Sequence, residues 1–427
     1  MIWNDTYVIG KDSEIRIMSI REDASYIIQE SIRKVLPNEA VTLALRNKKF
    51  AAGKIYVVAC GKAAWEMADT AAGVLQERIQ AGVVCTKYGH VKGEILNTVC
   101  FEGGHPIPDE NSFRGTQAAL DMTADLKEED TVLFLLSGGA SALFEKPLIS
   151  EMELADITQQ LLACGADIVE INMVRKRLSA VKGGKFAKWC EPAQVYNIVL
   201  SDILGDPLDM IASGPTYPDS STAKDAFAVV EKYKLRLSVD TLQLLEIETP
   251  KQLNNVETVI TGSVKNLCKA AQQACEERGY RTILLTDQLN CEAKEAGAFL
   301  GAIAKSHQDS KESVAYIAGG ETIVHLTGSG KGGRNQEIAL AAANEIAGLK
   351  DTAVFSVGSD GTDGPTDAAG GYCDDKTKER LREQGICIFE TLRQNDAYPA
   401  LKKVDGLIIT GATGTNVNDL SVLLIKR

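Results

Sequence analysis

Glycine-rich loops hold most of the residues whose types and spacing suit chemistry. Each loop follows a short apolar run and carries polar or charged side chains among its glycines. The loops are ACGKAA (59–64), GGHPIPDE (103–110), LSGGASAL (136–143), LSDILGDPLDMIASGPT (200–216), GSDGTDGPTD (358–367) and GATGTNVND (411–419). Open α/β sheets bind ligands at the carboxyl ends of their strands, where glycine permits close approach and helix N-termini attract anions. One such loop is an ordinary turn, whereas several at one sheet edge would form a large polar site.

Three cations occupy positions that suit an anionic ligand. Lys62 follows a predicted buried strand and directly precedes a predicted helix, so its ammonium is expected near the N-terminus of that helix. Lys331 and Arg334 lie in and beside the turn GSGKGG (328–333), where two positive charges suit phosphate groups.

A basic segment, residues 172–188, has two open interpretations. Its charges could form a solvated helix face, which is the usual outcome for such a run. Alternatively, Asn172, Arg175 and Ser179 fall at i, i+3 and i+7, so they form one polar stripe that could face a cleft.

The aspartates of the strand-end loops fall into two groups. Asp202 and Asp206 share one loop, and Asp360, Asp363 and Asp367 share another. Aspartate in a glycine-rich turn commonly accepts a hydrogen bond from its own backbone. A functional subset would bind Mg²⁺ through one or two carboxylates or accept a proton from a substrate hydroxyl.

The turn GSGKGG also satisfies the dinucleotide pattern GxGxxG through Gly328, Gly330 and Gly333, and Asp351 lies near the position of a ribose-binding acid. Alone, it would favour a nicotinamide-dependent reductase. Two features weaken that interpretation: the preceding run TIVHLTG is predicted to form a hairpin with SVAYIAGG, and the motif lies near the chain's end. The P-loop pattern GxxxxGK[ST] does not occur in the sequence.

Composition excludes several classes of protein. The chain has 427 residues, with 46 Lys and Arg against 58 Asp and Glu, and a net charge of −12. This balance argues against nucleic-acid and anionic-membrane partners. The apolar runs are too short to span a membrane, no secretory signal is recognised, and ten cysteines without a CxxC indicate free thiols in the cytoplasm. The four histidines lack HExxH spacing, and we expect a structural role for His105.

Apolar runs alternating with helical patterns predict an α/β fold with two α/β domains. Runs apolar on both faces predict a doubly wound, Rossmann-like parallel sheet in residues 18–245. Residues 246–427 predict a smaller α/β domain whose sheet is mixed because of the hairpin. Residues 1–17 are expected to form a leader outside both domains.

Taken together and in this order, these segments resemble the class II glycerate kinases, the glycerate 2-kinase family whose C-terminal part is called MOFRL. The resemblance runs from about residue 20 to the end and is carried by VACGKAA, GGHPIPD, LLSGGASAL, NMVRKRLSAVKGGK, LSDILGDPLDMIASGPT, GGET, GKGGRNQE, GSDGTDGPTDAAGG and GATGTNVND. It implies ATP-dependent, Mg²⁺-assisted phosphorylation of D-glycerate to 2-phosphoglycerate, in a cleft between the two domains.

The resemblance also implies roles for individual residues. The expected catalytic residues are Lys62, Arg334, Asp202 and Asp360. Asp202 and Asp360 are also the expected Mg²⁺ ligands, and which of them is the base stays open. The expected substrate-binding residues are Ser137, Arg175, Glu321 and Asn416. The expected nucleotide- or phosphate-binding residues are Gly61, Gly138, Gly139, Lys331, Gly332 and Gly333.

Lys62 and Arg334 come from different predicted domains, so we expect the domains to close on the substrates. The alternative function is an NAD(P)H-dependent hydroxypyruvate reductase. Both functions imply small-molecule substrates, and the chain is expected to be a monomer or a homodimer.

Overall fold

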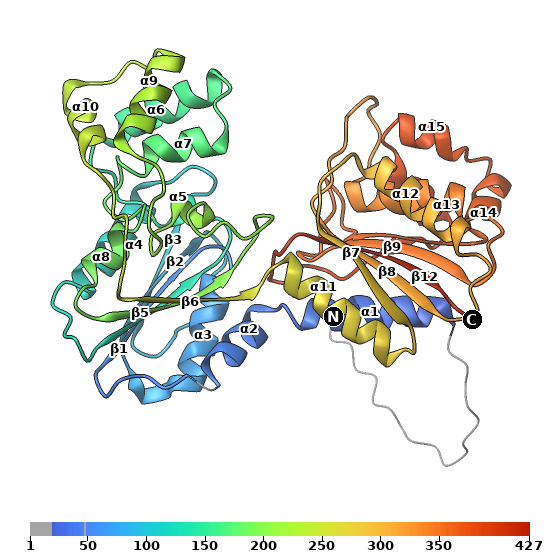
Figure 1. The fold of residues 1–427 in the computed structure, drawn as a ribbon, viewed down its shortest axis with the longest axis horizontal. Coiled ribbons are helices and arrows are strands. Elements are labelled where there is room, and N and C mark those ends of the chain that lie inside the picture. The colour runs from blue at the N-terminus through green and yellow to red at the C-terminus, as the bar shows by residue number, and fades with distance from the viewer. Residues whose placement is uncertain (1–18, 47) are drawn as a thin grey trace.

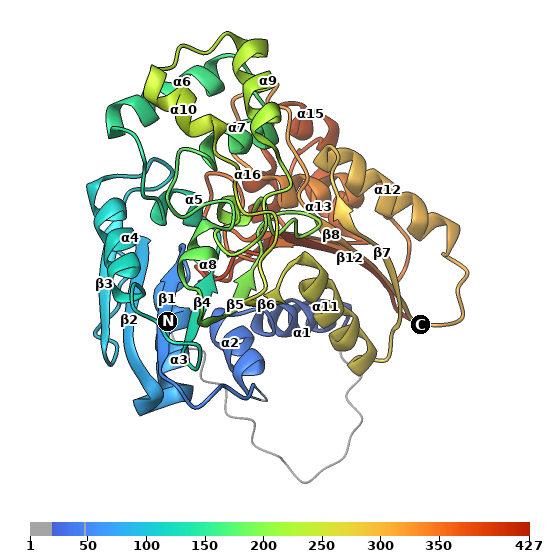
Figure 2. The same cartoon turned by 60° about the vertical axis from the view of Figure 1, so that its left-hand side comes forward.

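A computed structural model describes residues 19–46 and 48–427, and the predicted leader, residues 1–17, lies outside the described residues. Two sheets, each covered by helices on both faces, lie side by side (Figures 1 and 2). The architecture is therefore the predicted pair of α/β domains.

The first sheet is entirely parallel, with strand order β3-β2-β1-β4-β5-β6. Its strands are β1 (Ile55–Cys60), β2 (Ile79–Lys87), β3 (Thr98–Gly103), β4 (Thr131–Leu136), β5 (Gln194–Leu200) and β6 (Val256–Gly262). This order reverses between β1 and β4, and ligands of doubly wound sheets bind at such a switch point. The Rossmann-like prediction is confirmed.

Alternate residues of each strand pack into opposite layers. Val57 and Ala59 pack under α2 (Pro37–Leu45) and α3 (Ala64–Leu75), while Val58 and Cys60 pack into the opposite layer. The helices of that opposite layer are α4 (Glu110–Met122), α5 (Ala140–Leu143) and α8 (Lys185–Trp189). Burial on both faces explains why these strands read as continuous apolar runs.

Four helices form a separate layer above this domain (Figure 1). They are α6 (Glu151–Ala163), α7 (Ile168–Arg175), α9 (Ala223–Tyr233) and α10 (Val239–Glu246), and they share a core around Ile157, Leu161 and Val174. Short turns complete the connections: η1 (Gln76–Arg78) and η2 (Ile211–Ser213).

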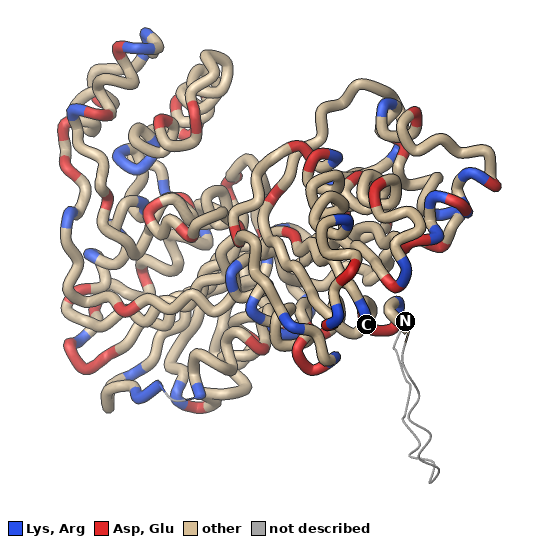
Figure 3. Tube along the Cα trace, turned by 45° about the vertical axis from the view of Figure 1, so that its right-hand side comes forward, with Lys and Arg blue, Asp and Glu red and all other residues tan. Residues whose placement is uncertain are grey.

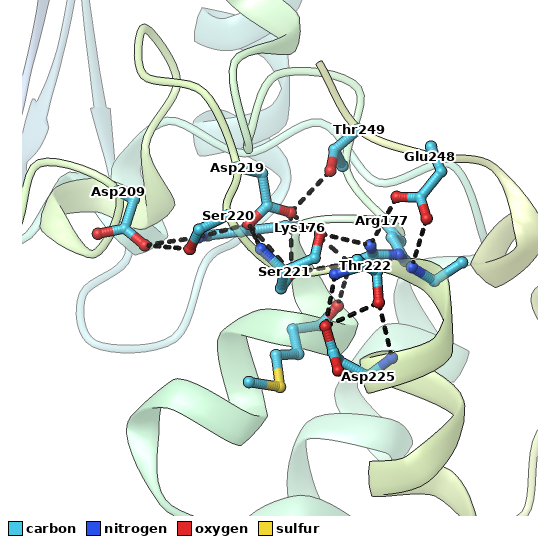
Figure 4. A network of polar contacts seen from close by, with 12 residues as sticks. Lys176, Arg177, Asp209, Asp219, Ser220, Ser221, Thr222, Asp225, Glu248 and Thr249 are labelled. Atoms are coloured by element: carbon cyan, nitrogen blue, oxygen red, sulfur yellow. Dashed lines mark hydrogen bonds and ion pairs between the residues drawn. The ribbon is translucent and has the colours of Figure 1, made fainter. Parts of the chain in front are cut away.

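The basic segment, residues 172–188, is largely buried, so the solvated-face interpretation was wrong, while the polar stripe facing a cleft stays a prediction. Lys176 donates to Asp219 at 3.1 Å, and both guanidinium termini of Arg177 donate to Ser221, in a network drawn in Figure 4. Lys185 donates to three backbone carbonyls, and burial lowers its pKa to about 8. Each of these cations is hydrogen-bonded to groups inside the protein, as buried charges must be. The segment fixes the helical layer to the sheet.

The second sheet is mixed, with order β11-β10-β9-β12-β8-β7. Its strands are β7 (Arg281–Leu289), β8 (Val314–Gly320), β9 (Thr352–Gly358), β10 (Gly370–Asp374), β11 (Leu407–Ile408) and β12 (Asp419–Ile425). One face packs against α1 (Ile20–Arg33) and α11 (Val264–Glu277). The other face packs against α12 (Ala293–Ser306), α13 (Arg334–Glu345), α14 (Thr377–Glu383), α15 (Ile388–Arg393) and α16 (Ala397–Lys403).

The hairpin predicted around GGE (319–321) is wrong, although the sheet is mixed as expected. β7 pairs with one edge of β8 and β12 pairs with the other, so no edge is left for residues 322–327. That segment is irregular apart from a bridge between Ile323 and Glu292. The sheet is mixed because β12 runs antiparallel to both β8 and β9.

Two segments belong to a different domain from the one predicted for them. β6, which was predicted for the second domain, extends the first sheet. α1, predicted for the first domain, packs on the second sheet, where its Asp23 accepts hydrogen bonds from Tyr280 at 2.9 Å and Lys426 at 2.7 Å. The chain therefore crosses between the domains after α1 and again after β6.

Basic and acidic residues are interspersed over both domains (Figure 3). Among the described residues, no helix is long and apolar enough to cross a membrane. All ten cysteines are free.

Candidate active site

Two turns meet at the switch point of the first sheet. Because β1 pairs with β4, the turn after Cys60 lies beside the turn after Leu136. The N–H of Lys62 donates to the Gly138 carbonyl at 2.9 Å, and the N–H of Ala63 donates to Ser137 Oγ at 3.1 Å. The hydroxyl of Ser137 therefore holds the two turns together.

Gly61 and Gly139 are required by this geometry. Gly61 has φ 117°, and a Cβ there would lie 2.3 Å from Ser137 Oγ. Gly139 has φ 88°, and a Cβ there would lie 3.1 Å from His105 Nε2 and 3.2 Å from Lys62 Cγ. The imidazole of His105 and the stem of Lys62 therefore converge on Gly139.

The imidazole of His105, which lies near the side chain of Lys62, is shifted toward its neutral form. Burial lowers its pKa, and the charges of Lys62 and Lys87 lower it further. The sequence indicated only a structural role for His105, but its ring stands beside Lys62 at the carboxyl edge of the sheet.

Asp202 follows β5 and reaches the same edge. A Cβ on Gly138 would lie 2.2 Å from Asp202 Oδ2, so the carboxylate rests directly on that glycine. Burial raises the pKa of Asp202, its own backbone amide and the charge of Lys62 oppose the shift, and the charge of Glu321 adds to it. Asp202 is therefore influenced by the charge of a cation of the first domain and by that of an acid of the second.

Arg334 is the first residue of α13 and is held by acids on two sides. Its Nε donates to Asp419 Oδ2 at 2.5 Å and its Nη2 to Asp419 Oδ1 at 3.0 Å, which makes a bidentate pair. Its Nη1 donates to Glu321 Oε1 at 3.0 Å. Burial alone would lower the pKa of Arg334, but the hydrogen bonds and charge of Asp419 and the charge of Glu321 raise it. The guanidinium is therefore permanently charged and fixed in direction.

Asp360 and Asp419 both lie beside Gly358. A Cβ on Gly358 would lie 3.3 Å from Asp360 Oδ1 and 3.5 Å from Asp419 Oδ1, so both carboxylates flank that glycine. Asp360 Oδ1 also accepts the N–H of Thr362 at 2.9 Å, which orients the side chain.

Asn418 joins the two halves of this site. Its Nδ2 donates to the Asp202 carbonyl at 3.1 Å and to Glu321 Oε2 at 3.3 Å. The predicted residue Asn416 is exposed instead, and its Oδ1 accepts the N–H of Asn418 at 3.4 Å. Asp202, Glu321 and Arg334 are thus linked through hydrogen bonds across the junction of the domains, and the charge of Lys62 acts on Asp202.

Arg175 is close to the switch point but faces the scaffold. Its Nη2 lies 3.5 Å from the Ser141 carbonyl and 3.5 Å from Glu145 Oε2. Lys182 is fully buried nearby and donates to the same Ser141 carbonyl at 2.8 Å. These side chains support the short helix α5 that follows Gly139.

A cavity of about 840 Å³ opens beside Arg334 in the second domain. Glu321, Asp360, Gly332 and Gly333 lie on its wall, and Leu204 enters it from the first domain. Lys331, which was predicted to bind phosphate, is not among the lining residues. Its Nζ lies 4.5 Å from the ring centroid of Tyr398.

The glycines of the GxGxxG pattern serve close packing within the protein. A Cβ on Gly328 would lie 2.4 Å from the Gln394 carbonyl oxygen, and one on Gly330 would lie 2.5 Å from that same oxygen. A Cβ on Gly333 would lie 2.3 Å from the carboxyl carbon of Asp363. The pattern therefore has a structural cause independent of any dinucleotide.

Asp363 occupies the N-terminus of α13, where a dinucleotide fold would place pyrophosphate. Its Oδ1 accepts the N–H of Asn335 at 3.1 Å and its Oδ2 the N–H of Gln336 at 2.9 Å. Burial raises the pKa of Asp363, while these amides and the charge of Arg334 oppose the shift. With the helix amides already paired to a carboxylate, this turn lacks the anion site of a nicotinamide-dependent reductase.

The donor chemistry at the junction fits Mg²⁺. Among residues 19–46 and 48–427, no group of three or more His, Cys, Asp or Glu side chains could hold a metal by itself. Mg²⁺ is typically held by one or two carboxylates together with water and substrate phosphates, so such a group is not needed. Asp202 and Asp360, the ligands expected from the sequence, and Glu321, which shares a cavity wall with Asp360, each have carboxylate oxygens of the required kind.

Two residues that face this site were not singled out from the sequence. Asn418 and Asp419 belong to the loop GATGTNVND, but nothing in that run showed that they, and not Asn416, turn toward Arg334. The signal was only that two polar residues immediately precede an apolar strand.

Comparisons with known proteins agree with these motifs. A family model described as "Domain of unknown function (DUF4147)" matches residues 23–246, and one described as "MOFRL family" matches residues 314–419. The D-glycerate 2-kinase of Thermotoga maritima is 48% identical over 413 residues, covering 95% of this chain and 99% of that protein. The chain belongs to the MOFRL glycerate kinase family.

Other relatives place the family in context. A crystal structure of glycerate kinase from Thermotoga maritima superposes on this glycerate kinase family member with a TM-score of 0.91 at 48% identity, covering 95% of this chain and 99% of that one. A protein of Agrobacterium vitis named putative hydroxypyruvate reductase is 34% identical, covering 100% of this chain and 96% of that protein.

Proposed function

We propose that this member of the glycerate kinase family transfers the γ-phosphoryl group of ATP to the 2-hydroxyl of D-glycerate. The observation that carries the proposal is the linked set of Lys62, Asp202, Glu321 and Arg334 at the domain junction. Phosphoryl transfer requires cations on the phosphate oxygens, acids for a metal, and a proton acceptor near the attacking hydroxyl. This set contains all three kinds of group.

Lys62 and Arg334 act as the two cations, of which Arg334 is fixed by its bonds to Asp419 and Glu321. Lys62 projects from the switch point of the first sheet, and Arg334 is aimed by its bidentate pair with Asp419. Held from opposite sides, they would neutralise the charge that develops on the transferring group. Their origin in different domains supports the closure expected from the sequence.

Asp202 is the proposed proton acceptor. Its carboxylate rests on Gly138 beside Lys62, and burial raises its pKa toward the operating range of a base. The hydroxyl oxygen of D-glycerate forms a bond to the γ-phosphorus, the bond from that phosphorus to the β-bridging oxygen breaks, and ADP leaves. The hydroxyl proton passes to Asp202.

Asp360 and Glu321 are the residues that would hold Mg²⁺ together with the phosphates of ATP. When bound, Mg²⁺ supplies charge neutralisation and orientation of the phosphates. Asp360 is oriented by the amide of Thr362, and Glu321 by Arg334 and Asn418. The buried Asp202 then stays available as the base.

A pair of assays separates this function from the reductase alternative. In one cuvette, ADP release is followed with ATP, Mg²⁺ and D-glycerate, and in the other, NADH or NADPH oxidation is followed with hydroxypyruvate. We expect D-glycerate-dependent ADP release and no loss of nicotinamide absorbance. Oxidation of the nicotinamide without ADP release would overturn the proposal. A cytoplasmic location and a monomeric or homodimeric state stay predictions.

A further inference from the structure

The cavity beside Arg334 is much larger than a three-carbon acid needs. Its volume of about 840 Å³ falls in the range of roughly 300–1,000 Å³ found for pockets that enclose drug-sized ligands. Arg334, Glu321 and Asp360 lie on its wall, so the proposed phosphoryl-transfer groups open into this space. The remainder of the wall extends into the second domain and has a different chemistry.

One side of the cavity is apolar and exposed. Ile323 and Leu326 are 48% and 81% exposed, and both line the cavity with Val324 and Pro365. Ile323, Val324 and Leu326 lie on the irregular segment that was expected to form a strand. Large apolar side chains gathered around a concave surface provide cover for an apolar ring.

Four amides of the glycine-rich wall are already paired within the protein, so these four are not available to phosphate. The N–H groups of Thr327 and Gly328 donate to Asn395 Oδ1 at 2.8 and 2.9 Å, and that of Gly330 donates to the Gln394 carbonyl at 2.9 Å. The N–H of Lys331 donates to Asp396 Oδ1 at 2.8 Å. This wall is therefore neutral, and it suits the part of a ligand that carries no charge.

Two polar side chains on the same cavity wall, Thr322 and Glu337, have hydrogen-bonding capacity left for a ligand. Thr322 is 3% exposed, and its Oγ1 is buried without a hydrogen-bond partner. Glu337, also buried, accepts one hydrogen bond, from Asn395 Nδ2 to its Oε1 at 3.0 Å. A hydroxyl donor and a carboxylate acceptor on one wall match the hydroxyls of a sugar.

The switch point of the first sheet offers a contrasting environment. The first amides of the turn and of α3 are paired internally: Lys62 N–H with Gly138, Ala63 N–H with Ser137 and Ala64 N–H with Gly61. What remains there is charged or polar side chains, among them Lys62 and Asp202. Such a site suits a small hydroxy acid.

We propose that the cavity of the second domain binds the nucleoside part of ATP. The base lies between Ile323 and Leu326 and the glycine-rich wall, the ribose faces Thr322 and Glu337, and the phosphates extend to Arg334. This inference rests on the proposed function, since ATP is the phosphoryl donor there. It divides the substrates between the domains, with the nucleoside on the second and the acid on the first.

The test truncates the apolar cover without touching the phosphoryl-transfer groups. The variants are Leu326→Ala and the double variant Ile323→Ala with Leu326→Ala, and Phe389→Ala is the control, because Phe389 is 77% exposed on α15 and does not line the cavity. ADP affinity is measured by calorimetry, and the KM values for ATP and D-glycerate by steady-state kinetics. We expect the double variant to bind ADP about tenfold more weakly. The KM for D-glycerate and the behaviour of Phe389→Ala should stay those of the wild type.

Two competitors distinguish the nucleoside from the phosphates. Adenosine should compete with ATP in the wild type and lose potency in the double variant, whereas inorganic tripolyphosphate should keep its potency in both. An unchanged ADP affinity in the double variant, or equal loss of potency by both competitors, overturns the nucleoside site. Because Leu326 is exposed, its single truncation tests the cavity even if the double variant folds poorly.

The outcomes also separate this inference from the proposed function. A wild-type protein that phosphorylates D-glycerate while its ADP affinity is insensitive to both truncations overturns the nucleoside site alone. A wild-type protein that shows the expected ADP and adenosine pattern but releases no phosphorylated acid overturns the proposed function and supports the nucleoside site.

Discussion

The side-chain amide of Asn418 donates a hydrogen bond to the backbone carbonyl of Asp202, 216 residues earlier in the chain. The bond ties the loop before β12 to the loop after β5, and thus one domain to the other. The same amide donates to Glu321, which in turn accepts from Arg334. Asp202, Glu321 and Arg334 are therefore connected through hydrogen bonds within the protein, and the predictions below test what the proposed groups contribute.

Replacing Asp202 by asparagine should remove the proton acceptor and leave the shape of the site intact. We expect kcat to fall by about 100- to 10,000-fold, the usual range for loss of a general base, with little change in ADP affinity. Single-turnover measurement with saturating D-glycerate and ATP reports the chemical step. Asp206→Asn is the matched control, because it lies in the same loop at φ 52°, a conformation that asparagine tolerates. Near-normal single-turnover rates in Asp202→Asn would show that another group accepts the proton.

The same substitution should stabilise the fold at neutral pH. Burial raises the pKa of Asp202 in the folded protein, so the folded state holds this proton more tightly than the unfolded chain. The free energy of unfolding therefore decreases as pH rises from the usual aspartate pKa through the raised folded value, and it stays lower above that window. Asp202→Asn abolishes this loss, so its Tm should exceed that of the wild type at neutral pH.

Thermal unfolding of both proteins across the acidic range checks the sign. The difference in Tm should shrink as pH falls below the folded pKa of Asp202, where the wild-type carboxyl is also neutral. A variant less stable than the wild type at neutral pH would contradict the burial argument.

Arg334→Lys keeps the positive charge but loses the planar fork that Asp419 holds. Lysine has a single ammonium group in place of the planar guanidinium, so it cannot reproduce the three hydrogen bonds of Arg334 to Asp419 and Glu321. The positive charge would therefore no longer be held in a fixed direction. We expect kcat to fall by about 100-fold or more, as when one preorganised donor to a developing negative charge is lost. Arg393→Lys serves as the control, since Arg393 is 60% exposed and pairs only locally with Glu390. Equal activity of Arg334→Lys and Arg393→Lys would remove Arg334 from the proposed chemistry.

Gly328→Ala tests whether the GxGxxG pattern serves packing or a dinucleotide. The added Cβ would lie 2.4 Å from the Gln394 carbonyl oxygen, so the free energy of unfolding should fall by about 1–3 kcal/mol, typical of overpacking. Gly73→Ala on α3 meets nothing within 4 Å and should raise stability by about 0.5–1 kcal/mol. Urea unfolding compares the two. A Gly328→Ala variant that kept full stability would show that the glycine is not needed for packing.

The strand-end loops could be read from the sequence because parallel strands bring their carboxyl ends to one edge. Lys62, Gly138 and Asp202 are brought together for this reason, although they follow three different strands. The strands that precede them are buried on both faces, so their sequences are continuously apolar. That pattern allowed the strands to be predicted. The Rossmann-like sheet was predictable in the same way.

Sheet membership and side-chain direction were not predictable. The run 256–262 has the composition of a strand in either sheet, and only its long-range pairing with β5 places it in the first. Residues 322–327 have a strand-like pattern, but β12 already occupies the edge of β8. Asn416 and Asn418 are two residues apart in one loop, and the backbone at Asn418, with φ 65°, turns it inward.

The charges of the basic segment illustrate a third limit. Lys176, Arg177 and Lys182 resemble a solvated face in sequence, yet their partners Asp219, Ser221 and Glu145 lie tens of residues away. Local spacing carries no information about such partners. The local cations that remain for anionic substrates are therefore those at the junction of the domains, led by Lys62 and Arg334.

Phosphorus NMR of the products formed from ATP, Mg²⁺ and D-glycerate tests the central claim most directly. The account predicts that the signals of ADP and of 2-phosphoglycerate appear together, in equal amounts, and that Asp202→Asn forms neither at the wild-type rate. A product phosphorylated at another oxygen would contradict the proposed position of transfer. No phosphorylated acid at all, with ATP unconsumed, would contradict the kinase itself.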